Sequence, residues 1–173
     1  NIIEAYRRSK IKKMLYVSTA CVYPTTLQKE FSQPPLQEED ALKYGAMPDS
    51  YYGWAKLMGE IQCQAYQIEY GMNIAIVRPF NPYGPRESFD PKDSHVIPAL
   101  IKKAVKKENP FIVWGSGGQA RGFTYISDLV EGMIMAMEKS NDVNPINLGT
   151  DKATPIKELA ELILKLTRHN IPI

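Results

Sequence analysis

The sequence contains little cysteine, no long apolar run and no excess of charge of one sign, and each absence excludes a class of protein. Cys21 and Cys63 are the only cysteines among 173 residues, which is too few for a disulfide framework and typical of a reducing compartment. No apolar run approaches the roughly 20 residues that span a bilayer, and no signal-peptide pattern opens the sequence, so we expect a cytoplasmic protein. The 21 Lys and Arg against 19 Asp and Glu leave a formal charge of +2. This near-balance does not indicate the basic surface of a nucleic-acid-binding protein.

The composition is that of an ordinary globular chain. Apolar residues make up 44% and charged residues 23% of the sequence, which excludes a disordered or fibrous chain. A chain of this length buries roughly 70% of the surface that it exposes when unfolded, which is enough for one sizeable core. No cluster of Cys, His, Asp and Glu has the spacing of metal ligands, so we expect no metal site.

Apolar strands alternate along the sequence with amphipathic helices. The run MLYVST over residues 14–19 is of the kind that lies buried on both faces of a parallel sheet. The proline-rich stretch from Pro24 to Pro48 is predicted as a long excursion near the surface. The alternation predicts an α/β fold with a doubly wound parallel sheet. We expect further strands over residues 73–79, 111–114, 122–126 and 145–149, and helices over residues 1–10, 50–71, 95–107 and 127–139.

Local signals refine three of these elements. The helix over residues 50–71 carries Leu57, Ile61, Ala65 and Ile68 on one apolar stripe. The glycine-rich run over residues 115–118 is followed by a predicted strand, not by a helix that could bind a phosphate, so we expect a hairpin turn there. Thr154 and Pro155 have the residue types of an N-cap and a first helical position, and they predict a last helix.

A sheet of this kind normally begins with a nucleotide-binding βαβ unit that contains a glycine-rich turn. The 173 residues contain no such unit. We therefore expect the sequence to be the later part of a longer protein and to be inactive alone.

The strongest chemical signal is the pair Tyr52 and Lys56 in the helix predicted over residues 50–71. Four residues apart, the two side chains lie on one face of the helix, one turn from each other. A cation beside a phenol favours the phenolate, which is the form that a general base for hydride chemistry at an alcohol requires. The alternative is an exposed Tyr and Lys without function, because this spacing is common by chance.

A second signal lies where the strand over residues 14–19 ends. Ser18 and Thr19 stand at its carboxyl end, where open α/β sheets bind their ligands. A hydroxyl there can hydrogen-bond the same substrate oxygen that Tyr52 deprotonates. The alternative is a threonine that ends a strand and has no further role.

Four motifs in this order resemble the extended short-chain dehydrogenase/reductase family, which comprises the NAD-dependent epimerases and dehydratases of nucleotide sugars. The motifs are the strand end at residues 17–24, the Tyr52/Lys56 pair, RPFNPYGP over residues 78–85 and GFTYISD over residues 122–128. The resemblance implies a Rossmann-like fold. In it, residues 1–80 form the latter part of the NAD(P)-binding domain, and residues 81–173 form a mixed substrate-binding lobe with returning Rossmann elements. It also implies NAD or NADP as cofactor and a homodimer.

The resemblance assigns roles to single residues. Thr19, Tyr52 and Lys56 match the catalytic Ser/Thr, Tyr and Lys of the family, and Tyr52, Lys56 and Pro79 match positions that contact the cofactor. It implies that the nucleotide-sugar substrate is bound by Thr19, Ala20, Cys21, Asn81, Ser94, His95, Val96, Lys103, Gln119 and Arg121.

Cys21 and His95 form a candidate pair of bases. Cys21 lies two positions after Thr19, so on a strand both side chains face the same way, and His95 is expected to open a helix. A base on one face of a sugar ring removes a proton next to a transient ketone, and an acid on the other face returns it with inversion. The alternatives are a small buried hydrophobe for Cys21 and a backbone-bonding helix terminus for His95.

Two branches of the family share these segments. Residues 21–24 and 94–100 resemble GDP-L-fucose synthases, and residues 21–24 also resemble GDP-mannose 3,5-epimerases. The tail over residues 146–161 resembles the GDP-mannose 3,5-epimerases more, but these have Lys in place of His95. The resemblance thus implies a nucleotide-sugar epimerase acting on GDP-mannose or a related GDP-hexose through a transient 4-keto sugar. The alternatives are an epimerase/reductase that consumes NADPH and a non-catalytic sugar-nucleotide-binding or interaction module.

Overall fold

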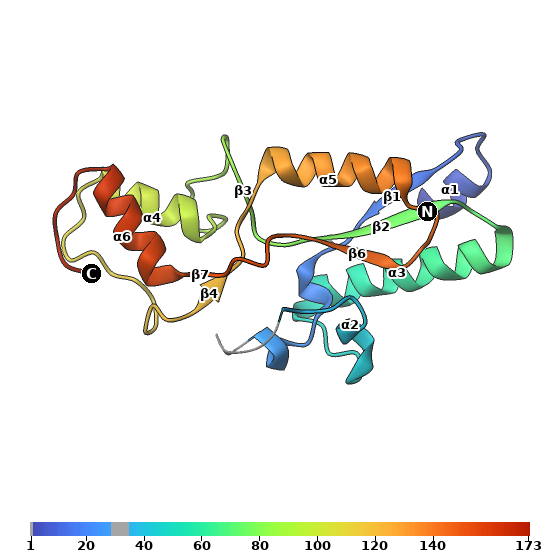
Figure 1. The fold of residues 1–173 in the computed structure, drawn as a ribbon, viewed down its shortest axis with the longest axis horizontal. Coiled ribbons are helices and arrows are strands. Elements are labelled where there is room, and N and C mark those ends of the chain that lie inside the picture. Colours follow the sequence, from blue (N-terminus) through green and yellow to red (C-terminus); the bar gives the residue numbers. More distant parts are fainter. Residues whose placement is uncertain (1, 29–34) are drawn as a thin grey trace.

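A parallel three-stranded sheet is the centre of the computed structural model, which describes residues 2–28 and 35–173 (Figure 1). Its strands are β1 (Met14–Val17), β2 (Ile74–Pro79) and β6 (Pro145–Leu148), in the order β1-β2-β6. Met14 pairs with Ile74 at one end of the sheet, and Pro79 pairs with Leu148 at the other. The parallel sheet between helices confirms the predicted α/β class.

Burial follows strand position rather than strand composition. The central strand β2 has Ile74, Ala75, Ile76 and Val77 buried, because strands pair with it on both sides. The strand β1 is an edge strand of the described sheet, and its side chains are half-buried, with Val17 39% exposed. The prediction that the run over residues 14–19 is buried on both faces is therefore wrong, although a strand does form there.

Helices cover both faces of the sheet. The helices α1 (Ile2–Arg7) and α3 (Ser50–Tyr70) lie on one face, where Ile3, Tyr6 and Cys63 pack against β2. The helix α5 (Ile126–Lys139) lies on the opposite face (Figure 1). This two-sided cover is the doubly wound arrangement that the alternating pattern predicted. Within the described residues, no helix combines the length and apolarity needed to cross a membrane.

The segment between β1 and α3 is only partly a surface excursion. It contains the short helices η1 (Ala20–Val22), η2 (Thr25–Gln28) and α2 (Asp40–Lys43), while residues 29–34 of the predicted excursion lie outside the described residues. Val22 and Tyr23 are fully buried and pack with Ala41 and with Leu57 of α3. The segment is therefore anchored to α3 at both of its described ends.

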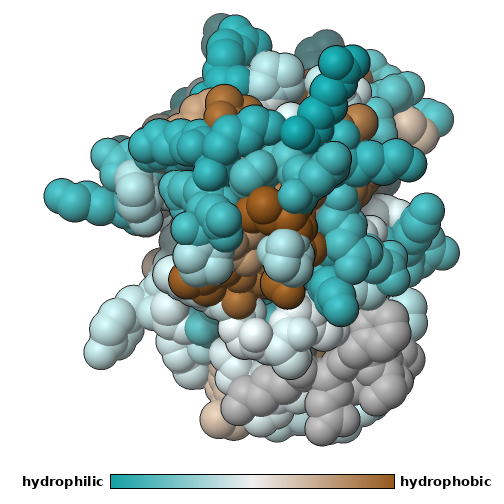
Figure 2. Space-filling model, turned by 90° about the vertical axis from the view of Figure 1, so that its left-hand side faces the viewer, coloured by the Kyte–Doolittle hydropathy of each residue, from teal (hydrophilic) through white to brown (hydrophobic). Residues whose placement is uncertain are grey.

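A second cluster of secondary structure lies at the end of the molecule that carries the C-terminus (Figure 1). Here α4 (Val96–Val105) packs on α6 (Ile156–Leu166) around a separate apolar core. Two short pairs connect this region to the rest: β3 (Pro82–Tyr83) is parallel to β5 (Thr124–Tyr125), and β4 (Ala120–Arg121) is antiparallel to β7 (Thr154–Pro155). Hydrophilic side chains cover most of this end, around a smaller apolar area (Figure 2).

Three predictions for this region are wrong. Residues 111–114 form no strand, because Phe111 packs into the core between α4 and α6, so residues 115–118 are not a hairpin turn. Thr154 does not cap α6, since it pairs in β7 and the helix begins at Ile156. The first amides of the helix are satisfied by carbonyls of the glycine-rich segment: Ile156 N donates to Gln119 O at 2.8 Å and Lys157 N to Gly117 O at 3.0 Å.

Candidate active site

The helix α3 brings Tyr52 and Lys56 to the carboxyl end of β1. Lys56 Nζ donates a hydrogen bond to Val17 O at 2.8 Å, and the same ammonium lies 5.8 Å from the centroid of the Tyr52 ring. Tyr52 is 53% exposed, so a ligand can reach this residue. The predicted neighbourhood of phenol and cation is therefore present, and it lies where open α/β sheets bind ligands.

Close packing fixes the start of α3 against the segment that follows β1. A Cβ atom at Gly53 would lie 2.2 Å from Cys21 O, so only glycine fits at this approach. The amide of Asp49 donates to the same carbonyl at 2.8 Å. The backbone of Cys21 is thus held by the first turn of the helix that carries Tyr52.

Thr19 and Cys21 are adjacent, but not for the predicted reason. The strand β1 ends at Val17, and Cys21 lies in η1, so the argument from side-chain alternation on a strand is wrong. Thr19 is instead the N-cap of η1, and its Oγ1 accepts a hydrogen bond from Cys21 N at 3.2 Å. This hydrogen bond holds Thr19, Ala20 and Cys21 together in a single helical turn.

A buried ion pair lies behind these residues. Arg78 Nη2 donates to Glu60 Oε2 at 2.7 Å and Arg78 Nε to Glu60 Oε1 at 3.0 Å, with the two side chains only 3% and 2% exposed. Arg78 Nη1 also donates to Tyr23 OH at 2.8 Å and to Glu38 O at 2.7 Å. Burial lowers the pKa of Arg78, but the hydrogen bonds and charge of Glu60 outweigh it, and the pKa is raised.

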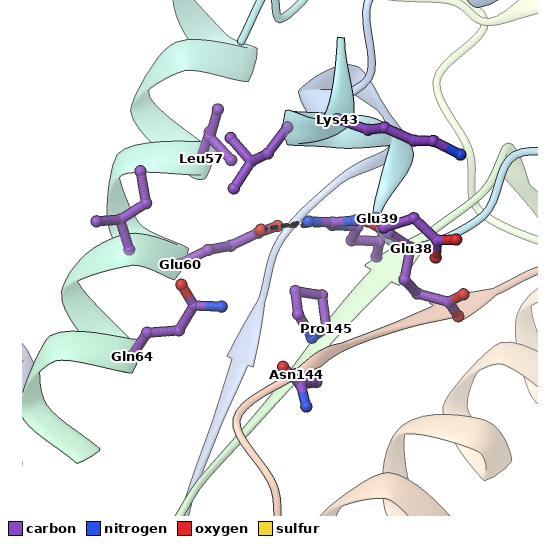
Figure 3. Close-up of a pocket in the computed structure, with 11 residues that line it drawn as sticks. Glu38, Glu39, Lys43, Leu57, Glu60, Gln64, Asn144 and Pro145 are labelled. Carbon is purple, nitrogen blue, oxygen red and sulfur yellow. Dashed lines mark hydrogen bonds and ion pairs between the residues drawn. The ribbon is translucent and has the colours of Figure 1, made fainter. Parts of the chain in front are cut away.

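The ion pair borders a cavity of about 580 Å³ between α3 and the segment that contains α2 (Figure 3). Figure 3 shows Glu60 on α3, with a dashed line for its pair with Arg78, Glu38 and Glu39 beyond that pair, and Asn144 and Pro145 below. None of the predicted catalytic residues lines this cavity. The cavity is therefore separate from the exposed site around Tyr52.

The second group of predicted site residues lies on α4 and the loop before it. His95 is the N-cap residue of α4, as expected of a histidine that opens a helix. Its Nδ1 lies 2.6 Å from Glu87 Oε1, while the His95 side chain is 78% exposed. Sequence reasoning missed Glu87, because a partner eight residues upstream in a loop leaves no periodic signal. Ser94 Oγ donates to His95 O at 3.2 Å, and Val96 begins the helix.

Asn81 connects the sheet to the distal elements. Its backbone has a positive φ of 36°, its side-chain Nδ2 donates to Gly122 O at 3.1 Å, and its carbonyl accepts from Thr124 N at 3.2 Å. Asn81 follows Pro79, the last residue of the central strand, by two positions. It therefore holds the chain where it leaves the sheet.

Three further predicted substrate residues lie near the β4–β7 pair and α4. Lys103 Nζ donates to Ile112 O at 2.8 Å, and Arg121 Nη1 donates to Ala120 O at 2.9 Å, with both side chains at the surface. The Gln119 side chain packs over Gly115. Within residues 2–28 and 35–173, no hydrogen bond or ion pair joins Lys103, Arg121 or His95 to the group around Tyr52.

Sequence and fold comparisons agree on one family. The NAD dependent epimerase/dehydratase family matches residues 1–149. A GDP-L-fucose synthase of Sinorhizobium fredii is 34% identical over 96% of this chain and 53% of its own length. A GDP-mannose 3,5-epimerase of Arabidopsis thaliana is 36% identical over 100% of this chain and 45% of its own length. The crystal structure of a GDP-L-fucose synthetase from Naegleria fowleri superimposes with a TM-score of 0.82 at 26% identity, over 98% of this chain and 54% of that one. The chain thus spans about half the length of the curated relatives that it matches.

Proposed function

Because the chain belongs to the NAD dependent epimerase/dehydratase family, we propose that the protein is a nucleotide-sugar epimerase that uses NAD(P) and acts on GDP-mannose or a related GDP-hexose. The observation that carries this proposal is the convergence of Tyr52, Lys56 and Thr19 at the carboxyl end of β1. The names of the relatives from Arabidopsis thaliana and Sinorhizobium fredii support a GDP-sugar as the substrate class.

In this proposal Tyr52 is the base for the sugar C4 hydroxyl. The Lys56 ammonium lies 5.8 Å from the centroid of the Tyr52 ring, and the Tyr52 oxygen receives the hydroxyl proton as a general base. Thr19 donates a hydrogen bond to the same sugar oxygen. Removal of this proton, together with loss of hydride from C4, converts the alcohol to a ketone.

The residues present fit a nicotinamide cofactor. The ammonium of Lys56 has three donors, of which one is used on Val17 O, so two are left for the hydroxyls of a ribose. Tyr52 and Pro79 are the further residues that would contact the cofactor. When bound, NAD(P) would supply the acceptor and the donor of the C4 hydride.

Cys21 and His95 would carry out the inversion. The C4 ketone acidifies the hydrogens on the neighbouring carbons, so one group removes a proton from one face of the ring and the other delivers a proton to the opposite face. Glu87, 2.6 Å from His95 Nδ1, orients the imidazole for this step. Lys103 and Arg121, with Ala20, Asn81, Ser94, Val96 and Gln119, would bind the nucleotide sugar.

The proposal divides the chain into two functional parts. Residues 1–80 contribute the latter part of the cofactor-binding domain, and residues 81–173 contribute the substrate lobe together with β6 and α5, which return to the sheet. We place the protein in the cytoplasm, since both cysteines are free thiols.

The outer face of α3 supports a homodimer. Apolar side chains recur there with the alternating spacing of three and four residues that is typical of helix–helix seams. Tyr51 is 93%, Met58 52% and Ile68 85% exposed, so the described residues leave at least half of each uncovered. The full stripe consists of Tyr51, Trp54, Met58, Ile61, Ala65 and Ile68. We call it the α3 stripe, and a second copy of the chain would pack against it.

The epimerase proposal is tested on the complete protein, supplied with NAD and GDP-mannose in deuterated water. Deuterium is expected to enter the sugar ring next to C4 without net consumption of the cofactor. Cys21→Ser is expected to slow this exchange by about 10²-fold or more, while Cys63→Ala, which changes the buried cysteine away from the site, leaves it unchanged.

Other outcomes of this assay identify the other candidates. When NADPH and a GDP-4-keto-hexose replace NAD and GDP-mannose, stoichiometric oxidation of NADPH would favour an epimerase/reductase, and absence of both cofactor and sugar-nucleotide binding would favour an interaction module. Full exchange in Cys21→Ser would refute the two-base role.

The dimer is tested by the mass of the complete protein in solution, measured by light scattering. Met58→Glu, which puts a charge into the α3 stripe, is expected to convert the dimer to a monomer. Gln62→Glu, an exposed position of the same helix outside the stripe, is the control and leaves the dimer intact. A dimer that survives Met58→Glu would refute this use of the stripe.

A further inference from the structure

We infer that Glu60, held in place by Arg78, is a positioning residue that sets the distance between Tyr52 and Thr19. This inference rests on the proposed function, because it concerns how the two residues that we assign to the reaction are held at a fixed distance from each other. Glu60 itself touches no substrate, since its side chain is only 2% exposed. It acts through Ser18, whose hydroxyl donates a hydrogen bond to Glu60 Oε1.

Three turns of α3 contact the segment from Val17, the last residue of β1, to Cys21. Gly53 lies against the carbonyl of Cys21, Lys56 binds the carbonyl of Val17, and Glu60 binds the hydroxyl of Ser18. Gly53 and Lys56 contact backbone carbonyls, whereas Glu60 alone of the three contacts a side chain of the segment. The Ser18–Glu60 contact therefore depends on a particular residue type at the position directly before Thr19.

The carboxylate of Glu60 is fixed, so Ser18 is fixed with it. Both carboxylate oxygens accept hydrogen bonds from Arg78, which is itself bound by Tyr23 OH and Glu38 O. A bidentate pair of this kind leaves the side chain one geometry. The guanidinium comes from the central strand β2, which is the most buried element of the sheet. The position of Ser18 is thus fixed, through Glu60, by a side chain of the buried strand β2 and not by residues at the surface.

The consequence concerns Thr19. Ser18 precedes it and is bound by Glu60, and Thr19 in turn caps the turn that contains Cys21. The backbone on either side is held by Ser18 N, which donates to Val77 O, and by Asp49 N, which donates to Cys21 O, both at 2.8 Å. Loss of the Ser18 hydroxyl bond therefore loosens Thr19 between these two fixed points, while Tyr52 lies on the 21-residue helix α3. Small displacements of this kind between reacting groups lower turnover strongly, by up to about 10²-fold for about 1 Å.

Ser18→Ala in the complete protein tests this inference, because the change leaves the Glu60–Arg78 pair intact. The matched control is Tyr6→Phe, which also removes one hydroxyl from a buried residue, here the donor to Asn73 O at 3.0 Å on the far part of the sheet. We expect kcat for epimerisation to fall by about 10-fold or more in Ser18→Ala at unchanged KM, and to stay within experimental error in Tyr6→Phe.

A second measurement is independent of turnover. Iodoacetamide is expected to alkylate Cys21 several-fold faster in Ser18→Ala than in the parent protein and in Tyr6→Phe, as followed by mass spectrometry of the Cys21 peptide. Cys63 is protected, since burial raises its pKa to about 12. Equal kcat values in the two variants, or equal alkylation rates, overturn the positioning role. If the parent protein epimerises no GDP-hexose, the proposed function fails, and the alkylation rates still decide whether Glu60 positions the segment.

Discussion

The change Glu60→Gln tests the energetics of the buried ion pair. It keeps the size and shape of the side chain but removes its charge, so the guanidinium of Arg78 is left uncompensated where only 3% of it is exposed. Glutamine also offers one acceptor oxygen where the carboxylate offers two, so one of the bonds at 2.7 and 3.0 Å is lost as well. Removing one partner of a buried pair lowers the free energy of unfolding by about 3–5 kcal/mol.

Urea-induced unfolding of the complete protein measures this loss. The control is Glu4→Gln, the same chemical change in the exposed cluster that Glu4 forms with Arg7 at 2.8 Å and Arg8 at 2.6 Å. Solvent screens that cluster, so the control is expected to lose much less stability than Glu60→Gln.

The double variant Glu60→Gln/Arg78→Met separates charge from packing. It leaves no buried charge, and it is expected to be more stable than Glu60→Gln alone. A loss below about 1 kcal/mol for Glu60→Gln, the range of exposed pairs, would show that water reaches Arg78. The reasoning would then be refuted. A double variant that is less stable than the single variant would show that the bonds of Arg78 to Tyr23 and Glu38, and not its charge, dominate.

Two further changes test the packing of α3. Gly53→Ala places a Cβ 2.2 Å from the backbone carbonyl of Cys21, so we expect a loss of about 1–3 kcal/mol or more in urea unfolding and a lower kcat, because η1 is displaced. An unchanged kcat would contradict this contact. Burial, with the charge of Glu60, raises the pKa of Cys63 from 9.0 to about 12. The folded state therefore binds this proton more tightly than the unfolded state, and stability falls as the pH rises from about 9 toward 12. Cys63→Ala is expected to reduce the change in the free energy of unfolding between about pH 8 and about pH 10, measured by urea titration. An equal change in the parent protein and the variant would show that another group causes it.

The long elements could be predicted from the sequence, because their patterns need only local information. The strands β2 and β6 and the helices α3, α4 and α5 all form where apolar periodicity placed them. Gly71 ends α3 with a φ of 64°, which glycine adopts without strain. The Tyr52/Lys56 motif was recognisable for the same reason, since both residues lie on one helix.

Elements that depend on distant partners could not be predicted in this way. Phe111 belongs to an apolar run whose composition favours a strand, yet no strand among the described residues pairs with it, and it packs against α4 and α6 instead. The amide of Ile156 is satisfied by Gln119 O, so Thr154 is not needed as a cap. The contacts of His95 with Glu87 and of Ser18 with Glu60 likewise join residues whose proximity only the fold creates.

The helix α3 shows why the more apolar stripe of a helix is not always its core face. Of the predicted stripe, Leu57 is 2% exposed, whereas Ile61 is 40% and Ile68 85% exposed. The face that contacts the sheet and η1 contains Gly53 and Gly59, where a Cβ would meet the carbonyl of Cys21 and the hydroxyl of Tyr16. Close approach thus selects glycine at these two positions of the inner face, which also buries Leu57, Glu60 and Cys63. Exposed apolar stripes of this kind mark interaction surfaces. The inner face therefore determines the geometry of Tyr52 and Lys56, whereas the α3 stripe is the proposed dimer contact, so substitutions on the two faces should separate turnover from dimer formation.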